Sequence, residues 1–303
     1  MKEIPDIVLR LTVTCVVAAT IMGGVFMLTS EAKLHNEHIA EQEVMLGLLG
    51  YGSDNPAPDS MKLFNLYRYI ISRGEDKFLG YVLPVKGDSG NEYQMLMIDL
   101  NGKFAATHPL SITAEKIADK GERDKALAAD LPGDLSFFFA DASIVVNNGD
   151  QRQAYLLPGA FPGFKALIKV FLALDPQLTV LGYDVVEQEE DPGLGDAIAF
   201  DFFKNQFRGR TIEAMKSIKV VKIPLPDDYL NYLEQEIQEI EMLDAEQNAI
   251  KEKYKDSDIH ALTGATISSD AVANGLKTML KKFSYRLHVL ENVINEQSIP
   301  VSF

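Results

Sequence analysis

Cysteine, tryptophan and positive charge are all scarce in this sequence of 303 residues. The single cysteine, Cys15, excludes an intrachain disulfide, a Cys-x-x-Cys redox pair and a thiolate metal cluster. The five histidines lack the spacing of metal ligands, so we expect no metal site. Only 29 Lys and Arg stand against 44 Asp and Glu, for a formal net charge of −15. Such a surface repels phosphates, and nucleic acid is therefore not an expected partner.

Charge is also absent from one long stretch near the N-terminus. Residues 11–28, LTVTCVVAATIMGGVFML, are about as long as one bilayer crossing, which takes about 20 residues. A cleaved signal peptide is the alternative, but the apolar run is too long for one and no A-x-A-like site follows it. Lys2 and Arg10 precede the run, whereas the next forty residues contain only Lys33. This bias predicts a single-pass protein of the inner (cytoplasmic) membrane, in contact with the lipid bilayer, with its C-terminal domain on the periplasmic or extracytoplasmic side.

Composition divides the chain into four parts. We expect a cytoplasmic N-terminus and transmembrane anchor at 1–30, a stalk helix and linker at 31–59, a folded domain made of 60–226 and 255–303, and a helical insertion at 227–254. The insertion is predicted to be one long helix, packed on its own domain or on a neighbouring subunit, because its apolar residues recur at three and four: Leu230, Leu233, Ile237, Ile240 and Leu243.

Three turn signals predict β-hairpins. Asn101-Gly102, Asn148-Gly149 and Asp175-Pro176-Gln177 each lie between apolar runs. Residues 112–131 and 197–207 have helical patterns. Hairpins outnumber strand–helix–strand units, so the expected fold class is α+β: an N-terminal transmembrane helix followed by an extracytoplasmic, mainly antiparallel sheet domain with helices packed on one side.

The stretch ALTGATISSDAV, residues 261–272, has two interpretations. It can be a capped helix after a turn, with Ser268, Ser269 and Asp270 as N-cap residues. It can also be a turn that holds a phosphate, since Gly264 permits close approach and the free N–H groups of a helix start suit an anion. The residues alone leave both open. The helix that follows has an apolar face of Val272, Leu276, Met279, Leu280 and Phe283.

TGATISS resembles the S/T-G-A-T-x-S/T signature of the RnfG/NqrC family, which are membrane-anchored subunits of redox-driven ion pumps. A second stretch, EDPGLGDAIAFDFFKNQFRG, is similar to the family's E-T-P-G-L-G segment and the helix after it. The strand–turn–strand upstream of it also matches. The resemblance covers about residues 160–222 and 256–280, plus the N-terminal span, in the family's order. Asp196 and residues 207–209 are more similar to RnfG than to NqrC.

The resemblance implies a covalent cofactor, FMN, joined through a phosphoester to Thr266. Thr263, Gly264 and Ala265 would shape the turn and the recognition site of a flavin transferase, and Leu194 would press on the ring face. The other residues implied to bind the cofactor are Ser268 and Ser269 at the helix start and Glu190, Asp191, Pro192, Gly193 and Gly195 around the isoalloxazine edge.

Three positions depart from the family pattern. His260 stands where the family has an Asp that belongs to the transferase's recognition pattern, and the nearest Asp is Asp258. Gln188 replaces a common His. Asp191 replaces a Thr, and its charge would disfavour an anionic reduced ring unless it is a solvated loop charge.

The implied function is that of an electron carrier inside an Rnf-type ferredoxin:NAD oxidoreductase complex that pumps ions, with its other membrane subunits as partners. The flavin would supply the chemistry, so we expect no catalytic side chain and no independent substrate turnover. The alternatives are a flavin-free accessory subunit, a membrane-tethered scaffold or adhesion protein that uses 227–254, and a self-contained flavin reductase. Against a nicotinamide-using reductase, no Gly-x-Gly-x-x-Gly follows a predicted strand.

Overall fold

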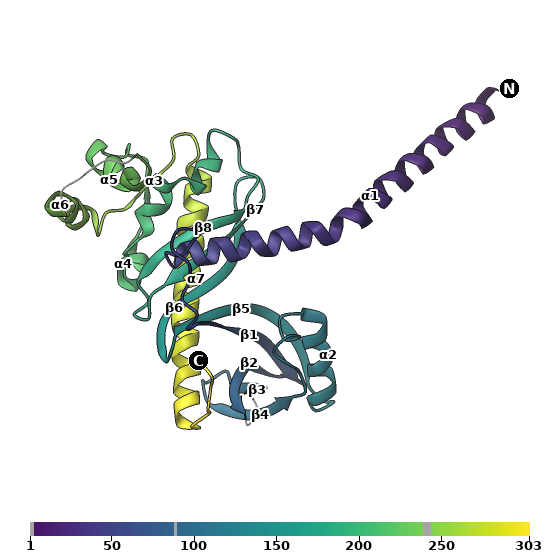
Figure 1. Ribbon diagram of the computed structural model, residues 1–303, viewed down its shortest axis with the longest axis horizontal. Helices are drawn as coiled ribbons and strands as arrows, with labels where there is room; N and C mark the ends of the chain where they lie inside the picture. Colours follow the sequence, from purple (N-terminus) through teal and green to yellow (C-terminus); the bar gives the residue numbers. More distant parts are fainter. Residues whose placement is uncertain (1–2, 88–89, 239–243) are drawn as a thin grey trace.

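A single antiparallel sheet of eight strands forms the centre of the molecule (Figure 1). The structure is a computed structural model that describes residues 3–87, 90–238 and 244–303. The strand order is β4-β3-β2-β1-β5-β6-β7-β8, and every neighbouring pair is antiparallel. The strands are β1 (Met61–Arg73), β2 (Asp76–Gly87), β3 (Gly90–Asp99), β4 (Phe104–Leu110), β5 (Ser136–Asn148), β6 (Gln151–Pro162), β7 (Leu167–Leu174) and β8 (Val180–Glu187).

The structure confirms the three predicted hairpins. They were predictable because the residues of each turn specify its conformation. Gly102 and Gly149 adopt the positive φ of 80° and 60° that the turns between β3 and β4 and between β5 and β6 require. In the turn between β7 and β8, the Asp175 carboxylate accepts hydrogen bonds from the backbone N–H groups of Gln177 at 2.9 Å and Thr179 at 2.7 Å. The predicted α+β class is confirmed with them.

Helices cover both faces of the sheet, so the expectation of helices on one side is wrong. Alternate residues of β1 point to opposite faces: Leu66 faces the long helix α7 (Thr266–Glu296), whereas Tyr69 and Ile71 face α2 (Lys120–Asp130). The end of α1 (Glu3–Leu48) packs on the same face as α2, over β5 to β8. The strands are apolar on both faces, and each face therefore needs a cover.

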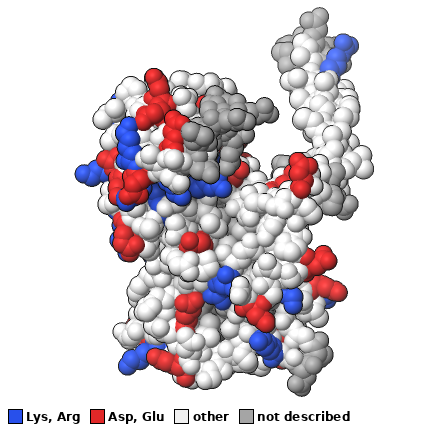
Figure 2. All heavy atoms as spheres, turned by 60° about the vertical axis from the view of Figure 1, so that its left-hand side comes forward, with Lys and Arg blue, Asp and Glu red and all other residues white. Residues whose placement is uncertain are grey.

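The predicted anchor and stalk form one continuous helix, α1, of 46 residues. Its segment Ile7–Thr29 is long and apolar enough to cross a membrane, with a mean hydropathy of 2.2, and none of it is buried against the rest of the protein. Arg10 is the only charged residue in this segment, which is otherwise white in Figure 2. Val44, Met45 and Leu48, at the far end of the helix, pack against the sheet. The candidate span is therefore joined to the sheet by helix alone.

Two predicted helices are shorter or broken. In residues 112–131, helix forms only over α2, where the Asp119 side chain accepts from the Glu122 N–H at 2.7 Å. Residues 197–207 are divided into η1 (Gly195–Ala199), α3 (Asp201–Lys204) and η2 (Asn205–Phe207), because Phe200 is extended. The break leaves the Ile198 carbonyl free to accept from the buried Tyr183 hydroxyl at 2.8 Å. The chain beyond contains α4 (Ile212–Ser217) and a parallel pair, β9 (Val220–Val221) with β10 (Ile259–His260).

The predicted long helix at 227–254 is wrong, because its two ends meet. It contains α5 (Asp227–Gln238) and α6 (Asp244–Tyr254), and the rings of Tyr229 and Tyr254 stack with centroids 4.2 Å apart. One straight helix would separate them by about 37 Å, at about 1.5 Å per residue. Leu233 is buried with Tyr229 against Phe202, so the insertion packs on its own domain. Of the predicted seam, Ile240 and Leu243 lie outside the described residues, as does the side chain of Ile237.

Candidate functional site

The turn after β8 and the turn before α7 touch, although they are 78 residues apart along the chain. The Ser268 hydroxyl donates a hydrogen bond to Oε2 of Glu190, and both residues are buried, at 2% and 4% exposure. A Cβ placed on Gly264 would lie 3.0 Å from Cδ2 of Leu194, and one on Gly195 would lie 2.9 Å from the Ser268 Oγ. The P-G-L-G and T-G-A-T stretches therefore form one site, which only small residues at these positions permit.

Glu190 connects this site to a third loop, between β6 and β7. Its Oε1 accepts from the backbone N–H groups of Phe164 at 2.9 Å and Lys165 at 3.1 Å. A Cβ on Gly163 would come within 2.4 Å of the same oxygen. A buried carboxylate with three donors is held firmly, because each bond to an ionised acceptor is stronger than a neutral one. The sequence analysis missed these loop residues; the Pro162-Gly163 turn signal was the available indication.

The turn after β8 presents an apolar side chain to the surface. Gly193 has φ of 76°, and the N–H groups of Leu194 and Asp196 both donate to the Asp191 carbonyl, at 3.1 Å and 3.3 Å. Leu194 is 46% exposed beside Gly264. An exposed leucine at a turn that two glycines shape can cover the face of a flat apolar ligand.

Helix α7 begins at Thr266, and its N-cap residue, Ala265, has no side chain that can accept a hydrogen bond. The prediction of Ser268, Ser269 and Asp270 as N-caps is wrong, because the helix starts before them. The Ser269 hydroxyl instead accepts from the Leu262 N–H and donates to the Ala265 carbonyl, both at 3.0 Å. The first turn of α7 therefore keeps N–H groups directed outward, with the positive end of the helix dipole behind them.

The hydroxyls of the turn differ in access. Thr263 and Gly264 are exposed, Ala265 is buried and Thr266 is half-buried. Thr266 is thus the first helical residue, at the end where an anion is favoured. The predicted apolar face of α7 is confirmed, since Val272, Leu276 and Leu280 are buried and Met279 and Phe283 pack against the same cluster.

Asp191 does not carry an isolated charge. Its carboxylate forms an ion pair with the Lys165 ammonium, and both side chains are partly exposed. The negative charge expected beside a bound ring is therefore partly compensated by a cation from the loop between β6 and β7. Pro192 lies exposed next to it.

All of the predicted cofactor-binding residues fall within a stretch that matches a known family. Residues 163–281 match the family described as FMN-binding domain. This stretch is therefore similar to an FMN-binding domain over somewhat more than a third of the chain. The resemblance to the RnfG/NqrC family expected from the two motifs is confirmed.

The chain is also similar to proteins whose names place them in ion-translocating complexes. The chain is 25% identical over 134 residues to one component of the proton-translocating ferredoxin:NAD(+) oxidoreductase complex of Clostridium ljungdahlii. That match covers 44% of this chain and 55% of the relative, so the chain spans about half the relative's length. Two solved structures are also similar. NqrC of Shewanella oneidensis has 17% identity, a TM-score of 0.32 and coverage of 46% of this chain and 55% of that one. One component of the Na(+)-translocating NADH-quinone reductase of Parabacteroides distasonis has 18% identity, a TM-score of 0.34 and coverage of 66% and 77%.

His260, which replaces the expected Asp, has contacts of its own. Its backbone N–H donates to the Gln206 side chain at 2.8 Å, and its Nδ1 lies 3.0 Å from the Ile223 carbonyl. The nearest acid, Asp258, accepts from the Lys219 N–H at 3.0 Å. Both residues thus hold the segment of β9 and β10 just before the turn.

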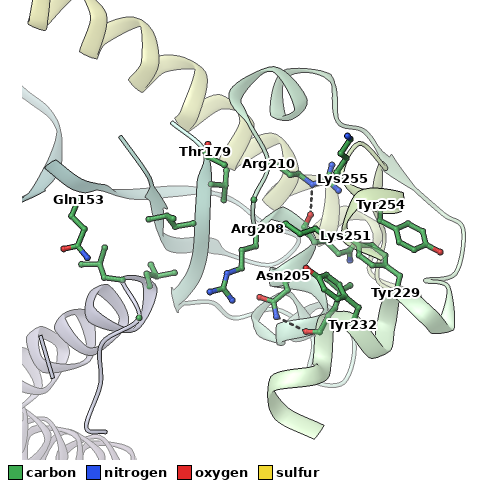
Figure 3. A pocket seen from close by; sticks show the side chains of 18 residues that line it. Gln153, Thr179, Asn205, Arg208, Arg210, Tyr229, Tyr232, Lys251, Tyr254 and Lys255 are labelled. Carbon is green, nitrogen blue, oxygen red and sulfur yellow. Dashed lines mark hydrogen bonds between the residues drawn. The ribbon is translucent and has the colours of Figure 1, made fainter. Parts of the chain in front are cut away.

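A separate hollow of 610 Å³ lies where the end of α1, β8 and the α5–α6 pair meet (Figure 3). Four cationic residues and three tyrosines are among the residues that line it: Arg208, Arg210, Lys251, Lys255, Tyr229, Tyr232 and Tyr254. The buried Arg210 guanidinium donates to the Ser257 carbonyl at 2.6 Å, which fixes α6 to the domain. None of the predicted cofactor residues lines this hollow. It is therefore distinct from the site at Thr266.

Proposed function

We propose that this chain is a membrane-anchored flavoprotein electron carrier, with FMN joined by a phosphoester to Thr266. It would pass electrons within an Rnf-type ferredoxin:NAD oxidoreductase complex that pumps ions. One observation carries the proposal: the two motif turns meet, through Ser268 with Glu190 and Gly264 beside Leu194, and Thr266 lies between these two contacts along the chain. The FMN-binding domain, the relative in a ferredoxin:NAD(+) oxidoreductase complex and the candidate membrane span support it.

The residues present fit a phosphate-linked flavin. The first-turn N–H groups of α7 are suited to the phosphate oxygens, since Ala265 provides no side-chain cap. Leu194 would cover the ring face and exclude water from it. The Glu190–Ser268 bond would hold the two turns at a fixed separation. Bound FMN supplies the redox chemistry, and the protein supplies attachment, orientation and electrostatics.

The partners follow from the same proposal. Other membrane subunits of the complex would give and take the electrons, and a flavin transferase would attach the FMN. The domain would lie on the extracytoplasmic side, where a lost cofactor cannot be replaced from the cytosol, and a covalent bond prevents that loss. The proposed domain division keeps 60–226 and 255–303 as one unit, because strands from the first part and α7 from the second share one core.

The test is to express the full chain with an active flavin transferase and to denature it. We expect a fluorescent gel band and an intact mass increased by one FMN less one water. Thr266→Ala should be dark and unmodified, because the acceptor oxygen is gone. Thr107→Ala, which removes an exposed hydroxyl on β4, is the matched control and should stay fluorescent. A dark wild-type band would favour the alternative, a flavin-free accessory or scaffold subunit.

A further inference from the structure

A second cavity, of 820 Å³, lies along α7 on the face that it turns to the sheet. The α7 residues that line it recur at three and four from Ile267 to Leu290, so they form one continuous helix face. The other wall consists of residues 140–143 of β5 and 157–162 of β6, with Leu66 and Arg68 of β1 and Tyr81 of β2. Figure 1 shows α7 running past these strands. A ligand in this groove would be long and narrow.

Positive charge exceeds negative charge at one end of the groove. The Arg68 guanidinium binds both oxygens of Asp141, with Nε 2.8 Å from Oδ1, and Arg286 adds Nη1 at 2.8 Å from Oδ2. Two guanidinium groups thus share one carboxylate. Lys282, one turn before Arg286 on the same helix face, also lines the groove. In a chain of net charge −15, this end of the groove is suited to an anion.

Tyr81 adds a hydrogen-bond donor that has no acceptor. The side chain lines the groove and is 5% exposed, and its hydroxyl is buried without a partner among the described residues. A buried polar group without a partner costs free energy, so such groups in folded proteins commonly indicate a missing ligand or water. The apolar side chains of Leu157, Met279 and Phe283 line the groove beyond this polar end.

This polar end is separate from the proposed flavin site. Thr266 and Arg286 are twenty residues apart on one straight helix, which is about 30 Å at about 1.5 Å per residue. That distance exceeds the length of an FMN molecule attached at Thr266. Arg68, Tyr81, Asp141 and Arg286 also lie outside residues 163–281, the part that matches the FMN-binding family.

We propose that this groove binds an amphipathic monoanion of the fatty-acid class. The carboxylate would accept from the Tyr81 hydroxyl and the Arg286 guanidinium, and the alkyl chain would lie along α7 against Leu157, Met279 and Phe283. The carboxylate would give the Tyr81 hydroxyl a hydrogen-bond acceptor and would neutralise part of the excess positive charge. The alkyl chain would cover the apolar side chains of the groove and remove their surface from water, which favours binding. The inference does not depend on whether FMN is attached.

The test measures binding of radiolabelled dodecanoate to the full chain in lipid nanodiscs, with empty nanodiscs subtracted. We expect saturable binding of one dodecanoate per chain, and binding of the uncharged methyl ester about tenfold weaker or less, because the charge-assisted bonds are lost. Arg286→Gln should weaken dodecanoate binding about tenfold, while Asp141 keeps its pair with Arg68. Tyr81→Phe should weaken it several-fold without lowering thermal stability, since the hydroxyl bonds nothing in the free protein.

Two variants serve as matched controls. Lys281→Gln removes an exposed cation from α7 outside the groove. Tyr93→Phe removes a phenol hydroxyl on the other side of the sheet, from a tyrosine that is 8% exposed against 5% for Tyr81. Both should bind dodecanoate as the wild type does. Equal losses in Lys281→Gln and Arg286→Gln would mean unspecific charge attraction and would overturn the proposal. Absence of saturable binding above empty nanodiscs would also overturn it and leave the groove to an apolar segment of another subunit.

Discussion

Gly264 and Gly193 share a backbone conformation but differ in their surroundings. Their φ values are 80° and 76°, a region that costs an L-residue about 1–2 kcal/mol. A Cβ at 193 would meet nothing within 4 Å, whereas one at 264 would press on Leu194 at 3.0 Å. We therefore expect Gly193→Ala to destabilise the chain by about 1 kcal/mol and Gly264→Ala by about 1 kcal/mol more, because the second also pushes the two turns apart. Urea unfolding measures the difference.

A double-mutant cycle isolates the contact between the turns. In a Leu194→Ala background the neighbour of the new Cβ is gone, and the cost of Gly264→Ala should fall to that of Gly193→Ala. If the two glycine variants differ as much without Leu194 as with it, the turns do not press on each other and the site is not the one described.

The residues of the candidate site, and the meeting of the two turns around one cofactor, came from the resemblance, but the individual contacts between the turns were not predictable. Glycine-shaped turns and the resemblance of two motifs brought Glu190, Leu194 and Thr266 into the prediction. The bond between Ser268 and Glu190 joins positions 78 apart, and no local pattern specifies such a pair. The N-cap prediction failed for the opposite reason: Ser269 has the chemistry of a cap but bonds the preceding turn from inside the helix.

Elements were predicted well where local chemistry decides them. The hairpins follow from their turn residues, and α7 follows from its periodicity. The errors lie where tertiary packing decides. Residues 197–207 break because Ile198, Phe203 and Phe207 must all be buried in the domain core. The insertion folds back because burial of Tyr229 and stacking of its ring on Tyr254 stabilise the chain more than a straight, solvated helix would.

The α5–α6 pair should be sensitive to acid through Asp228. Hydrogen bonds from the Lys253 ammonium and the Tyr254 hydroxyl lower the pKa of Asp228 below its ordinary value of 3.8. A carboxylate with a lowered pKa stabilises the fold above its unfolded pKa, and this contribution is lost as pH falls through the lowered folded value. Amide exchange in 227–238, corrected for intrinsic rates, should therefore lose protection as the pH is lowered below about 4.

In Asp228→Asn, the amides of 227–238 should be less protected from exchange than in the wild type at neutral pH, and acidification should lower their protection little further. Asp227→Asn is the matched control, because it removes a carboxylate from the same first turn and makes the same change near the helix dipole. It should keep the acid-dependent loss. A wild-type profile unchanged by Asp228→Asn would mean that the pairing with Lys253 and Tyr254 does not hold α6 to α5.

At the scale of the whole molecule, α1 fixes the position of the sheet relative to the candidate span. The span ends at Thr29. Among the described side chains of α1, the first that packs on the sheet is Val44, fifteen residues further along one continuous helix. That separation is about 22 Å at about 1.5 Å per residue. Leu48 then packs against β8 next to Gly182, where an added Cβ would lie 3.3 Å away. Because β8 leads directly into the turn at Glu190, the candidate site is connected to the candidate span by packed elements.

This connection predicts that the length of α1 controls electron transfer, if the proposed carrier function holds. Seven helix-forming residues inserted after Ala40 would raise the domain by about 10 Å in a fixed direction. Seven Gly and Ser residues inserted at the same place would add the same number of residues, but this flexible segment would let the domain return to its original height above the membrane. Both variants should carry FMN, as intact mass can verify, because the attachment site is untouched. Ferredoxin-dependent NAD reduction by membranes of a complemented deletion strain should fall more than tenfold with the helical insertion and recover in part with the flexible one, since transfer depends steeply on placement. Equal activity of all three chains would show that α1 acts as a tether rather than as a spacer.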